Sequence, residues 1–380
     1  MIASQYFPIK DVSSLRIHSY CKSLVKHGVD IKVLVIYPSQ ENISLIGNFE
    51  GVNYQFLSNK KSYQKNVFSK FYSRFLGLLF IGKYIRRKKI DAVLSYHDNF
   101  LTNIFLKCFT SLASIPYILD KTEYPYGYFR KSNFQKRIIK FNLKLFDGFI
   151  VISKELKSFY TNFSENVFLL PMTIDSDRFR EVLNKEKSKP KYIALTFGTH
   201  NRDGLYESVV AYHKYYKMNT LNPFLLYLVG DYAKLCEKFP ECYQIINYIK
   251  SNRLTNNIFI LGKQPIEKVP SILIGASCLL TTPIRYASGG FPTKLGEYML
   301  SGVPVVATNA GEISDYVINK FDILLSNVGD LTDVARNILF IQEHPLEAFK
   351  IGRNGMNTAK TKFNADTYIN DLIKFIYSLK

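Results

Sequence analysis

The chain alternates short apolar runs of strand length with longer segments in which apolar positions recur every three or four residues. This alternation is typical of parallel sheets whose strands are joined by helices. The pattern continues through both halves of the 380 residues, and one hydrophobic core seldom grows to that size. The sequence therefore predicts an α/β protein with two doubly wound units.

In the first half, residues 30–36 form a predicted strand that follows an amphipathic helix over residues 15–26, with Gly28 as its stop. Only residues 1–4 precede the loop at Tyr6, so we expect the first strand to be very short or the start to be trimmed. Further strands are predicted at 92–95, 117–119, 148–152 and 167–170.

The second half shows five clearer strands, each followed by Gly, Pro or polar residues and most of them then by a helix. They are predicted at 192–197, 224–229, 257–261, 278–282 and 304–308. The charged stretch 184–190 interrupts the pattern and is interpreted as a linker. The predicted organisation is a first domain at 1–183, a second at 191–364 and a C-terminal helix at 365–380 that packs back on the first domain.

Composition narrows the class of protein. A hydrophobic fraction of 47% with 21% charged residues is typical of a globular chain. No apolar run reaches the roughly 20 residues of a membrane-spanning helix, and the N-terminus lacks the pattern of a signal peptide. Cytoplasmic residence is therefore expected. The five cysteines are scattered and odd in number, so neither a disulfide framework nor a metal site is expected.

Positive charge is concentrated in the first half. Residues 1–190 carry 30 Lys and Arg against 15 Asp and Glu, which is +15 of the total of +19. An anionic membrane surface and nucleic acid both fit this charge. Helix-turn-helix, zinc-finger and RNP signatures are missing, so nucleic acid is not expected as a partner, although a basic nucleic-acid-binding protein stays an alternative.

Residues 64–90 interleave aromatic and basic side chains and end on four consecutive cations, Arg86 to Lys89. Such a segment can lie on an anionic lipid surface. The alternative is a crossover helix that buries its aromatic residues against the sheet. We expect peripheral association with the inner face of the cytoplasmic membrane.

The loop after the strand at 278–282 has the features of a diphosphate site. Gly289 and Gly290 permit close approach of the backbone, and Pro292 stands where a helix begins. Free amides at the positive end of that helix, with Lys294 nearby, would bind phosphate. Glu297 lies one turn further and could accept hydrogen bonds from ribose hydroxyls. The alternative is an ordinary strand–loop–helix crossover with a solvated Glu.

A second loop, 198–204, begins at Gly198 and contains Arg202, which could bind phosphate oxygens with its planar fork. Taken alone, this loop is better explained as a polar loop with a solvated Arg. GxxxxGK[ST] and a strand-borne GxGxxG are both missing from the chain, which argues against phosphate-loop nucleotidases and ordinary dinucleotide-binding dehydrogenases.

The run from Gly290 to Thr308, GFPTKLGEYMLSGVPVVAT, resembles the donor-binding motif of family 4 glycosyltransferases, the group 1 glycosyltransferases of the GT-B fold. Residues 151–153, 170–179 and 198–204 support the resemblance. It implies two facing Rossmann-like domains, with the acceptor bound mainly by the first and the nucleotide-sugar by the second. It also implies transfer with retention of anomeric configuration and without a metal.

The resemblance assigns roles to residues of the motif. Glu297 corresponds to the carboxylate that binds ribose, and Arg202 and Lys294 to the cations that bind the diphosphate. The remaining donor-binding positions belong to the two loops whose backbone approaches the donor: Gly198, Gly290, Phe291, Pro292 and Thr293.

The chain departs from the family pattern at two places. The family often has a second carboxylate eight positions before Glu297, where this chain has Gly289. Many members also place a His after the strand that begins near residue 115. Glu123 or Asp120 is the expected substitute in contacting sugar or acceptor, and His97 is the other catalytic candidate. For each, a loop residue satisfied by local hydrogen bonds is the alternative.

The function predicted from the sequence is retaining, metal-independent transfer of a hexose from a nucleoside diphosphate to a glycan or lipid-linked acceptor in surface polysaccharide synthesis. The nucleotide-sugar is a substrate, and no cofactor is expected. A nucleotide-sugar epimerase of the same fold and a catalytically inactive binding module are also compatible with the sequence.

Overall fold

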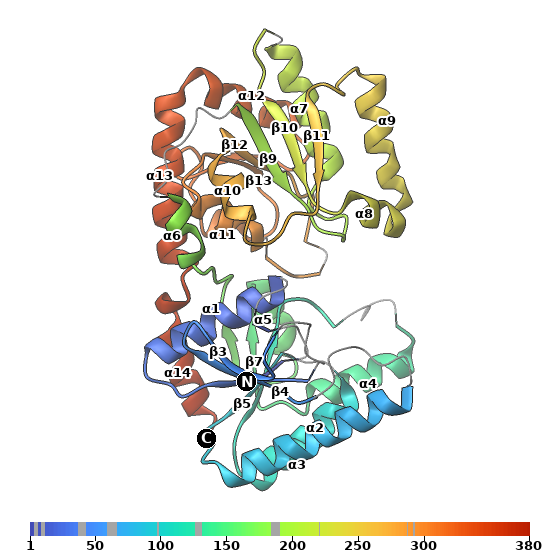
Figure 1. Ribbon diagram of the computed structural model, residues 1–380, viewed down its shortest axis with the longest axis vertical. Coiled ribbons are helices and arrows are strands. Elements are labelled where there is room, and N and C mark those ends of the chain that lie inside the picture. The colour runs from blue at the N-terminus through green and yellow to red at the C-terminus, as the bar shows by residue number, and fades with distance from the viewer. Residues whose placement is uncertain are drawn as a thin grey trace. The chain divides into compact units, whose positions relative to one another are not determined.

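The computed structural model describes residues 1–3, 7–8, 12–36, 43–58, 67–96, 99–125, 131–183, 191–219, 221–286, 288–291 and 293–380. These residues form two compact α/β units (Figure 1). The first consists of Met1–Thr173, Ser288–Gly290 and Ala365–Lys380, and the second of Ile174–Ala287 and Phe291–Asn364.

The first unit is built on a sheet with the strand order β3-β4-β2-β1-β5-β6-β7-β8. Its strands are parallel except for β3, which pairs antiparallel with β4. The strands are β1 (Ile2–Ala3), β2 (Lys32–Val35), β3 (Ile46–Phe49), β4 (Val52–Phe56), β5 (Val93–Tyr96), β6 (Tyr117–Lys121), β7 (Gly148–Val151) and β8 (Val167–Leu169).

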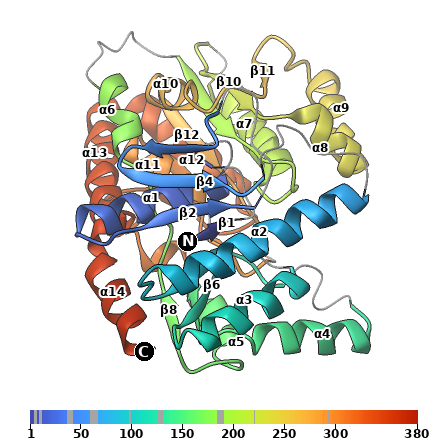
Figure 2. The same ribbon diagram turned by 60° about the horizontal axis from the view of Figure 1, so that its bottom comes forward.

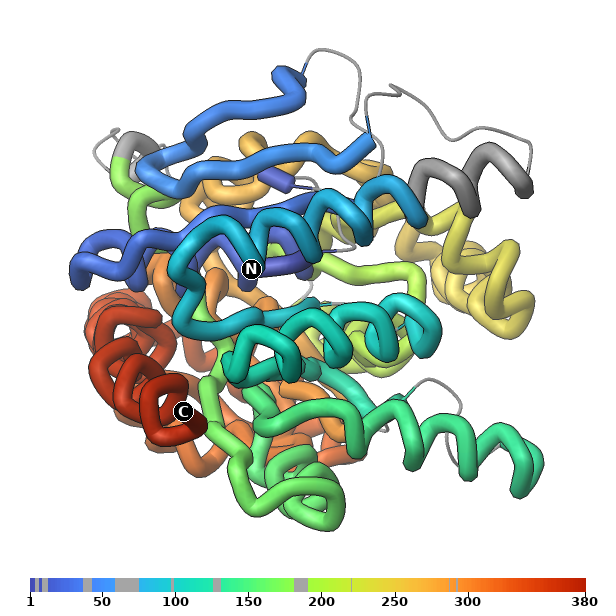
Figure 3. Tube along the Cα trace, turned by 90° about the horizontal axis from the view of Figure 1, so that it is seen from below, coloured from blue at the N-terminus to red at the C-terminus, as the bar shows by residue number. Residues whose placement is uncertain are grey.

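Helices cover the sheet of the first unit. They are α1 (Val12–Lys26), α2 (Val67–Arg87), α3 (Phe100–Leu112), α4 (Asn133–Leu143), α5 (Lys154–Tyr160), the 3-10 turn η4 (Ala365–Thr367) and α14 (Ile369–Ser378). Helices α2, α3 and α4 lie side by side as one layer (Figures 2 and 3). The C-terminal helix α14 contacts α1, and Leu372 is fully buried in the same core as Ile17 and Val33.

The second unit is built on a parallel sheet with the order β11-β10-β9-β12-β13-β14. Its strands are β9 (Tyr192–Thr196), β10 (Leu225–Val229), β11 (Ile258–Gly262), β12 (Cys278–Thr281), β13 (Val305–Thr308) and β14 (Leu324–Ser326). Successive residues of a strand point to opposite faces. Ile193 and Leu195 accordingly enter a core shared with α7, α9 and α12, while Ala194 lies buried on the other face.

The helices of the second unit pack in pairs, α7 against α12 and α11 against α13. They are α6 (Asp177–Leu183), α7 (Leu205–Met218), α8 (Tyr232–Lys238), η2 (Pro240–Cys242), α9 (Tyr243–Ser251), α10 (Val269–Ile274), α11 (Thr293–Leu300), η3 (Ile313–Asp315), α12 (Leu331–Glu343) and α13 (Pro345–Lys362). Among the described residues, no helix is both long enough and apolar enough to cross a bilayer.

The predicted fold class is confirmed: both units are Rossmann-like, and the C-terminal helix packs with the first. The N-terminal strand is very short, which was one of the two alternatives expected, and its Ile2 pairs with Leu34 of β2. Strands β3, β4 and β14 were not predicted from the sequence. Residues 174–183 were predicted to belong to the first domain, whereas α6 of this stretch packs on α10 in the second unit. The predicted linker at 184–190 lies outside the described residues.

Candidate functional site

The order of strands in the second unit indicates where a ligand would bind, at the carboxyl ends of the strands beside β9. Strand β9 comes first along the chain, and its neighbours β10 and β12 lead the chain outward in opposite directions. In such sheets, ligands bind beyond the carboxyl ends of the strands at this point of reversal. The loops that follow β9 and β12 are the two that carry the predicted phosphate-binding residues.

Gly204 holds these two loops together. Its φ is +68°, and a Cβ there would lie 1.8 Å from the carbonyl oxygen of Thr282 at the end of β12. The Thr282 hydroxyl donates a hydrogen bond to the Gly204 carbonyl at 2.8 Å and lies 2.7 Å from Ser208 Oγ in α7. The loop after β9 therefore turns into α7 directly against the end of β12, and only glycine fits this turn.

Helix α11 begins at Thr293 beneath the same edge of the sheet. The Tyr298 hydroxyl accepts a hydrogen bond from the Thr196 amide at 2.6 Å, which fixes the helix to the end of β9. The Phe291 ring is buried against Tyr316 and Phe363, with ring centroids 5.0 and 5.8 Å away. Phe291 is thus an anchor of the loop, which leaves its backbone as the part available to a donor. Pro292 lies outside the described residues.

Lys294, Asp203 and Gly198 form a charge cluster between the two loops. Lys294 Nζ lies 2.5 Å from Asp203 Oδ2, and the same oxygen accepts a hydrogen bond from the Gly198 amide at 2.6 Å. About a quarter of the Lys294 side chain is exposed along its stem, but Nζ is buried and meets no acceptor at hydrogen-bonding angles within the described part of the chain. The ammonium therefore retains N–H groups that phosphate oxygens could satisfy.

Electrostatics of this cluster favour an anionic ligand. Burial lowers the pKa of Lys294 below the ordinary lysine value, although Asp203 partly compensates. Burial alone would raise the pKa of Asp203, but Lys294, the Gly198 amide and Arg202 outweigh it and lower that pKa. Asp203 thus lies in the field of two cations, and Glu297 adds a second negative charge near Lys294. The exposed Arg202 contributes to this positive field from the loop after β9.

Glu297 lies one turn after Lys294 and is paired with Arg178 of α6. Arg178 Nη1 donates to Glu297 Oε1, and Arg178 Nη2 donates to the carbonyl of Ile266 at 3.2 Å. The Glu297 side chain is 22% exposed. Within the described residues, its second oxygen accepts no hydrogen bond. The carboxylate is therefore held on one side and available on the other.

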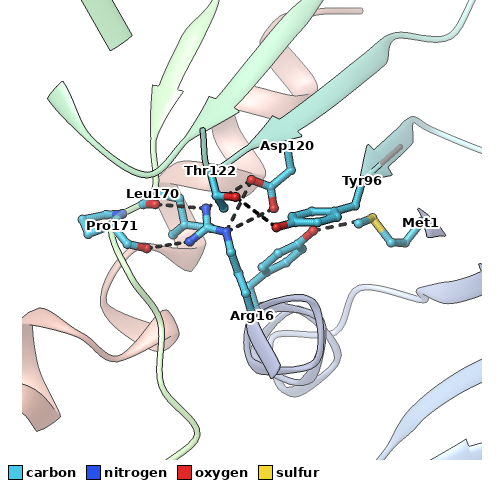
Figure 4. A network of polar contacts seen from close by, with 8 residues as sticks. Met1, Arg16, Tyr96, Asp120, Thr122, Leu170 and Pro171 are labelled. Carbon is cyan, nitrogen blue, oxygen red and sulfur yellow. Dashed lines mark hydrogen bonds and ion pairs between the residues drawn. The ribbon is translucent and has the colours of Figure 1, made fainter. Parts of the chain in front are cut away.

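Asp120, a catalytic candidate from the sequence, is fully buried in the first unit (Figure 4). Arg16 of α1 lies against both of its carboxylate oxygens at 3.2–3.4 Å and also donates to the carbonyls of Leu170 and Pro171 at 3.1 and 2.9 Å. Burial alone would lower the pKa of Arg16, but the charge and hydrogen bonds of Asp120 raise it. The pair joins α1, β6 and the end of β8, and Asp120 could reach a sugar only if this pair opened.

The other acceptor-side candidates have different settings. Glu123 is half-buried two residues beyond β6, and its carbonyl accepts a hydrogen bond from the Tyr160 hydroxyl at 3.3 Å. Glu123 makes at least one further interaction. His97 lies outside the described residues.

The departure at Gly289 has a physical reason within the first unit. Its φ is +71°, and a Cβ would lie 2.8 Å from both Leu156 and Tyr124. Ser153 Oγ donates to the Gly289 carbonyl, and the Tyr124 amide donates to the Ser288 carbonyl at 2.8 Å. A Glu at position 289 does not fit this backbone. At Gly290 the corresponding Cβ would lie 3.0 Å from the Thr122 carbonyl, so this glycine also allows close approach.

Asp203 and Arg178 were missed as site residues by sequence reasoning. Both lie in stretches that supported the family resemblance, 198–204 and 170–179. Arg178 is 119 residues from its partner Glu297, and no local pattern reveals that pairing. The only indication in the sequence was that each of these two stretches contains charged residues.

Comparison with protein families addresses the donor side of the chain. Residues 176–358 match the family described as glycosyl transferases group 1. The chain carries a group 1 glycosyltransferase domain. This match contains α6, the loop after β9, and α11, and so includes Arg178, Asp203, Lys294 and Glu297. No curated protein sequence matches the chain.

Solved structures of glycosyltransferases share the fold over nearly the whole chain. Sucrose-phosphate synthase from Thermosynechococcus elongatus matches 97% of this chain and 94% of its own, with a TM-score of 0.70 and 16% identity. A glycosyltransferase from Rickettsia africae matches 100% and 98%, with a TM-score of 0.70 and 15% identity. Anabaena HepE, solved with UDP and glucose, matches 99% and 98%, with a TM-score of 0.69 and 14% identity. The group 1 domain thus belongs to a chain of the GT-B fold.

Proposed function

We propose that this group 1 glycosyltransferase moves a hexose from a nucleoside diphosphate to a glycan or lipid-linked acceptor in surface polysaccharide synthesis, with retention of anomeric configuration and without a metal. Lys294, Arg202 and the backbone of Gly198, Gly290 and residues 291–293 bind the diphosphate. Glu297 binds the ribose. Glu123, and Asp120 or His97, serve the sugar and acceptor side.

The observation that carries this proposal is the position of Lys294 at the start of α11. The ammonium has unsatisfied N–H groups, a helix N-terminus beside it, and a neighbouring loop fixed by Gly204. A departing nucleoside diphosphate gains negative charge in the transition state, and fixed cations and amides stabilise that charge. A cation and a helix end can serve this role without a metal. Anabaena HepE, similar in fold, was solved with UDP-glucose, which fits the same class of donor.

A screen of nucleotide-sugars tests the proposal. Purified protein is heated with UDP-, GDP- and dTDP-sugars in buffer containing EDTA, and the unfolding temperature is recorded. One donor should raise it, because a ligand that binds only the folded state stabilises that state. If all of the donors leave the unfolding temperature unchanged, the proposed donor class is excluded. With the donor found, the anomeric configuration of the product follows from its NMR coupling constants.

Peripheral membrane association is proposed from the α2–α3–α4 surface, which combines exposed apolar residues with cations. The apolar residues include Phe75, Leu79, Phe105, Phe134 and Phe141, and the cations include Lys83, Arg86, Arg87, Arg137 and Lys140. Phe75 and Phe105 are in edge-to-face contact across α2 and α3. Residues 64–66, and the side chains of 67–74, lie outside the described part of the predicted segment. Exposed aromatic rings beside cations suit an anionic lipid surface.

Sedimentation with vesicles tests this association. The protein should pellet with phosphatidylglycerol vesicles at low salt, and the variant Arg86→Glu/Arg87→Glu should pellet less. The charge-matched control is Lys350→Glu/Lys360→Glu on α13, which should behave as the wild type. A wild type that stays in the supernatant contradicts the proposal, and salt-sensitive retention on DNA in place of vesicles would favour the nucleic-acid alternative.

A further inference from the structure

Arg178 of the second unit hydrogen-bonds to two separate segments, Glu297 of α11 and the loop between β11 and α10. It comes from α6, its side chain is 14% exposed, and it donates to Glu297 Oε1 and to the Ile266 carbonyl. Ile266 lies between β11 and α10. Arg178 thus links three separate segments of the unit around one carboxylate.

The guanidinium determines what Glu297 can offer a ligand. Two of its nitrogens are fixed by separate acceptors, so the planar fork has little freedom to rotate. Each carboxylate oxygen has two acceptor positions. Arg178 occupies one position on Oε1, while Oε2 has no partner within the described residues. At least three acceptor positions remain, enough for the two adjacent hydroxyls of a ribose.

We infer that Arg178 is a positioning residue which orients the Glu297 carboxylate, so that the protein distinguishes a ribonucleoside diphosphate from its 2′-deoxy counterpart. This inference rests on the proposed function, because it takes Glu297 as the ribose-binding residue. Without Arg178, the carboxylate can rotate and hydrogen-bonds the hydroxyl pair less well. A nucleotide that lacks the 2′-hydroxyl makes one hydrogen bond fewer to Glu297, so its affinity should fall less when Arg178 is removed.

A purely structural role for Arg178 makes a different prediction. If the ion pair only fastened α6 to α11, its loss would weaken binding of ribonucleotide and deoxyribonucleotide equally. The ratio of the two dissociation constants therefore distinguishes the two roles. A structural disturbance that weakens both nucleotides equally leaves this ratio unchanged, whereas loss of the orientation of Glu297 lowers it.

The test is calorimetric titration of the full chain with UDP, GDP, ADP and dTDP, and with the 2′-deoxy analogue of whichever ribonucleotide binds most tightly. The wild type should prefer the ribonucleotide by about tenfold, as expected for a hydrogen bond to a charged acceptor. Arg178→Met should bring this ratio close to one, mainly by weakening the ribonucleotide. Glu297→Gln should lower the ratio as well. Arg180→Met is the matched control: Arg180 lies on the same helix, its side chain is 76% exposed, and its partner is Asp177.

The possible failures are distinguishable. A wild type that binds none of UDP, GDP, ADP and dTDP removes the proposed donor site itself, whereas one that binds dTDP alone overturns this inference and leaves the donor site in place. A wild type that binds one of them without preferring ribose, or an Arg178→Met protein that keeps the wild-type ratio, overturns this inference and leaves nucleotide binding in place. Equal weakening of both nucleotides also overturns it. If Arg178→Met does not fold, Arg178→Gln, which retains N–H donors without the charge, should still lower the ratio.

Discussion

Lys294 shows how the setting of one residue connects sequence to chemistry. An exposed lysine beside a helix would be a mobile cation, but this ammonium is buried and in contact with a single carboxylate. A buried charge without full compensation is costly, and phosphate oxygens would supply the missing acceptors. The setting of Lys294 in the free protein therefore already suits an anionic ligand.

The pKa of Lys294 predicts the pH dependence of donor binding. Burial lowers this pKa below its ordinary value of 10.5, so the free protein loses the ammonium at a lower pH than an ordinary lysine. Because the diphosphate needs the charged form, donor affinity should fall as the pH rises through the lowered pKa. In Lys294→Arg, which stays charged, that alkaline loss should disappear. Titration calorimetry from neutral to alkaline pH measures both, and parallel curves for the two proteins would contradict the prediction.

Partners far apart in sequence explain what could not be predicted at the residue scale. Lys294 and Glu297 were recognisable because they share one helix turn and one motif. Asp203 and Arg178 were not, since each meets its partner only after the sheet has formed. The partner of Asp120 is also distant in sequence, because Arg16 precedes it by 104 residues. The sequence therefore did not reveal that this catalytic candidate is held in a buried ion pair.

At the scale of elements, hydrophobic patterning predicted the strands that form continuous apolar runs and missed β3 and β4 of the first sheet and β14 of the second. β12 and β13 are buried at every position and appear as apolar runs. β3 is largely exposed and lacks such a run, although the turn to β4 has a signal: Glu50 and Gly51 both adopt positive φ, which suits a two-residue hairpin. Gly51 was available in the sequence as that signal.

Gly204 permits a prediction about the junction of β9, α7 and β12. Gly204→Ala should cost about 3 kcal/mol of stability, because a Cβ would collide with the Thr282 carbonyl and the backbone is left-handed. Gly329→Ala is the matched control: its φ is +87° but nothing lies within 4 Å, so only the strain of about 1 kcal/mol applies. Urea denaturation compares them. Equal losses would show that the close approach at Gly204 does not matter.

At the scale of the whole molecule, the first unit is completed by the end of the chain. Leu372 of α14 is fully buried in the core that includes Ile17 and Val33. A basic first unit and a second unit that matches the group 1 glycosyltransferase family thus share one chain, and residues 365–380 belong to the first unit. This arrangement was predictable from the family resemblance, whereas the limits of the units were not, since they depend on contacts such as α6 with α10.

Leu372→Ala should therefore destabilise the first unit selectively. Removing a buried leucine side chain costs about 3 kcal/mol, and this loss should appear as faster hydrogen exchange in α1 and β2 but not in α7. Lys374→Ala, on the same helix with a side chain 79% exposed, should change exchange little. Uniformly faster exchange in both units would contradict the assignment of α14 to the first.

We propose that the start of α11 binds the diphosphate of a nucleotide-sugar. The direct test is to titrate the wild type and Lys294→Ala with the donor found in the thermal screen. Lys350→Ala, an exposed lysine on α13, serves as the control. Lys294→Ala should weaken donor affinity by at least about tenfold, as for loss of a charged hydrogen-bond donor, while Lys350→Ala should bind as the wild type does. Equal affinity of Lys294→Ala and wild type would contradict it.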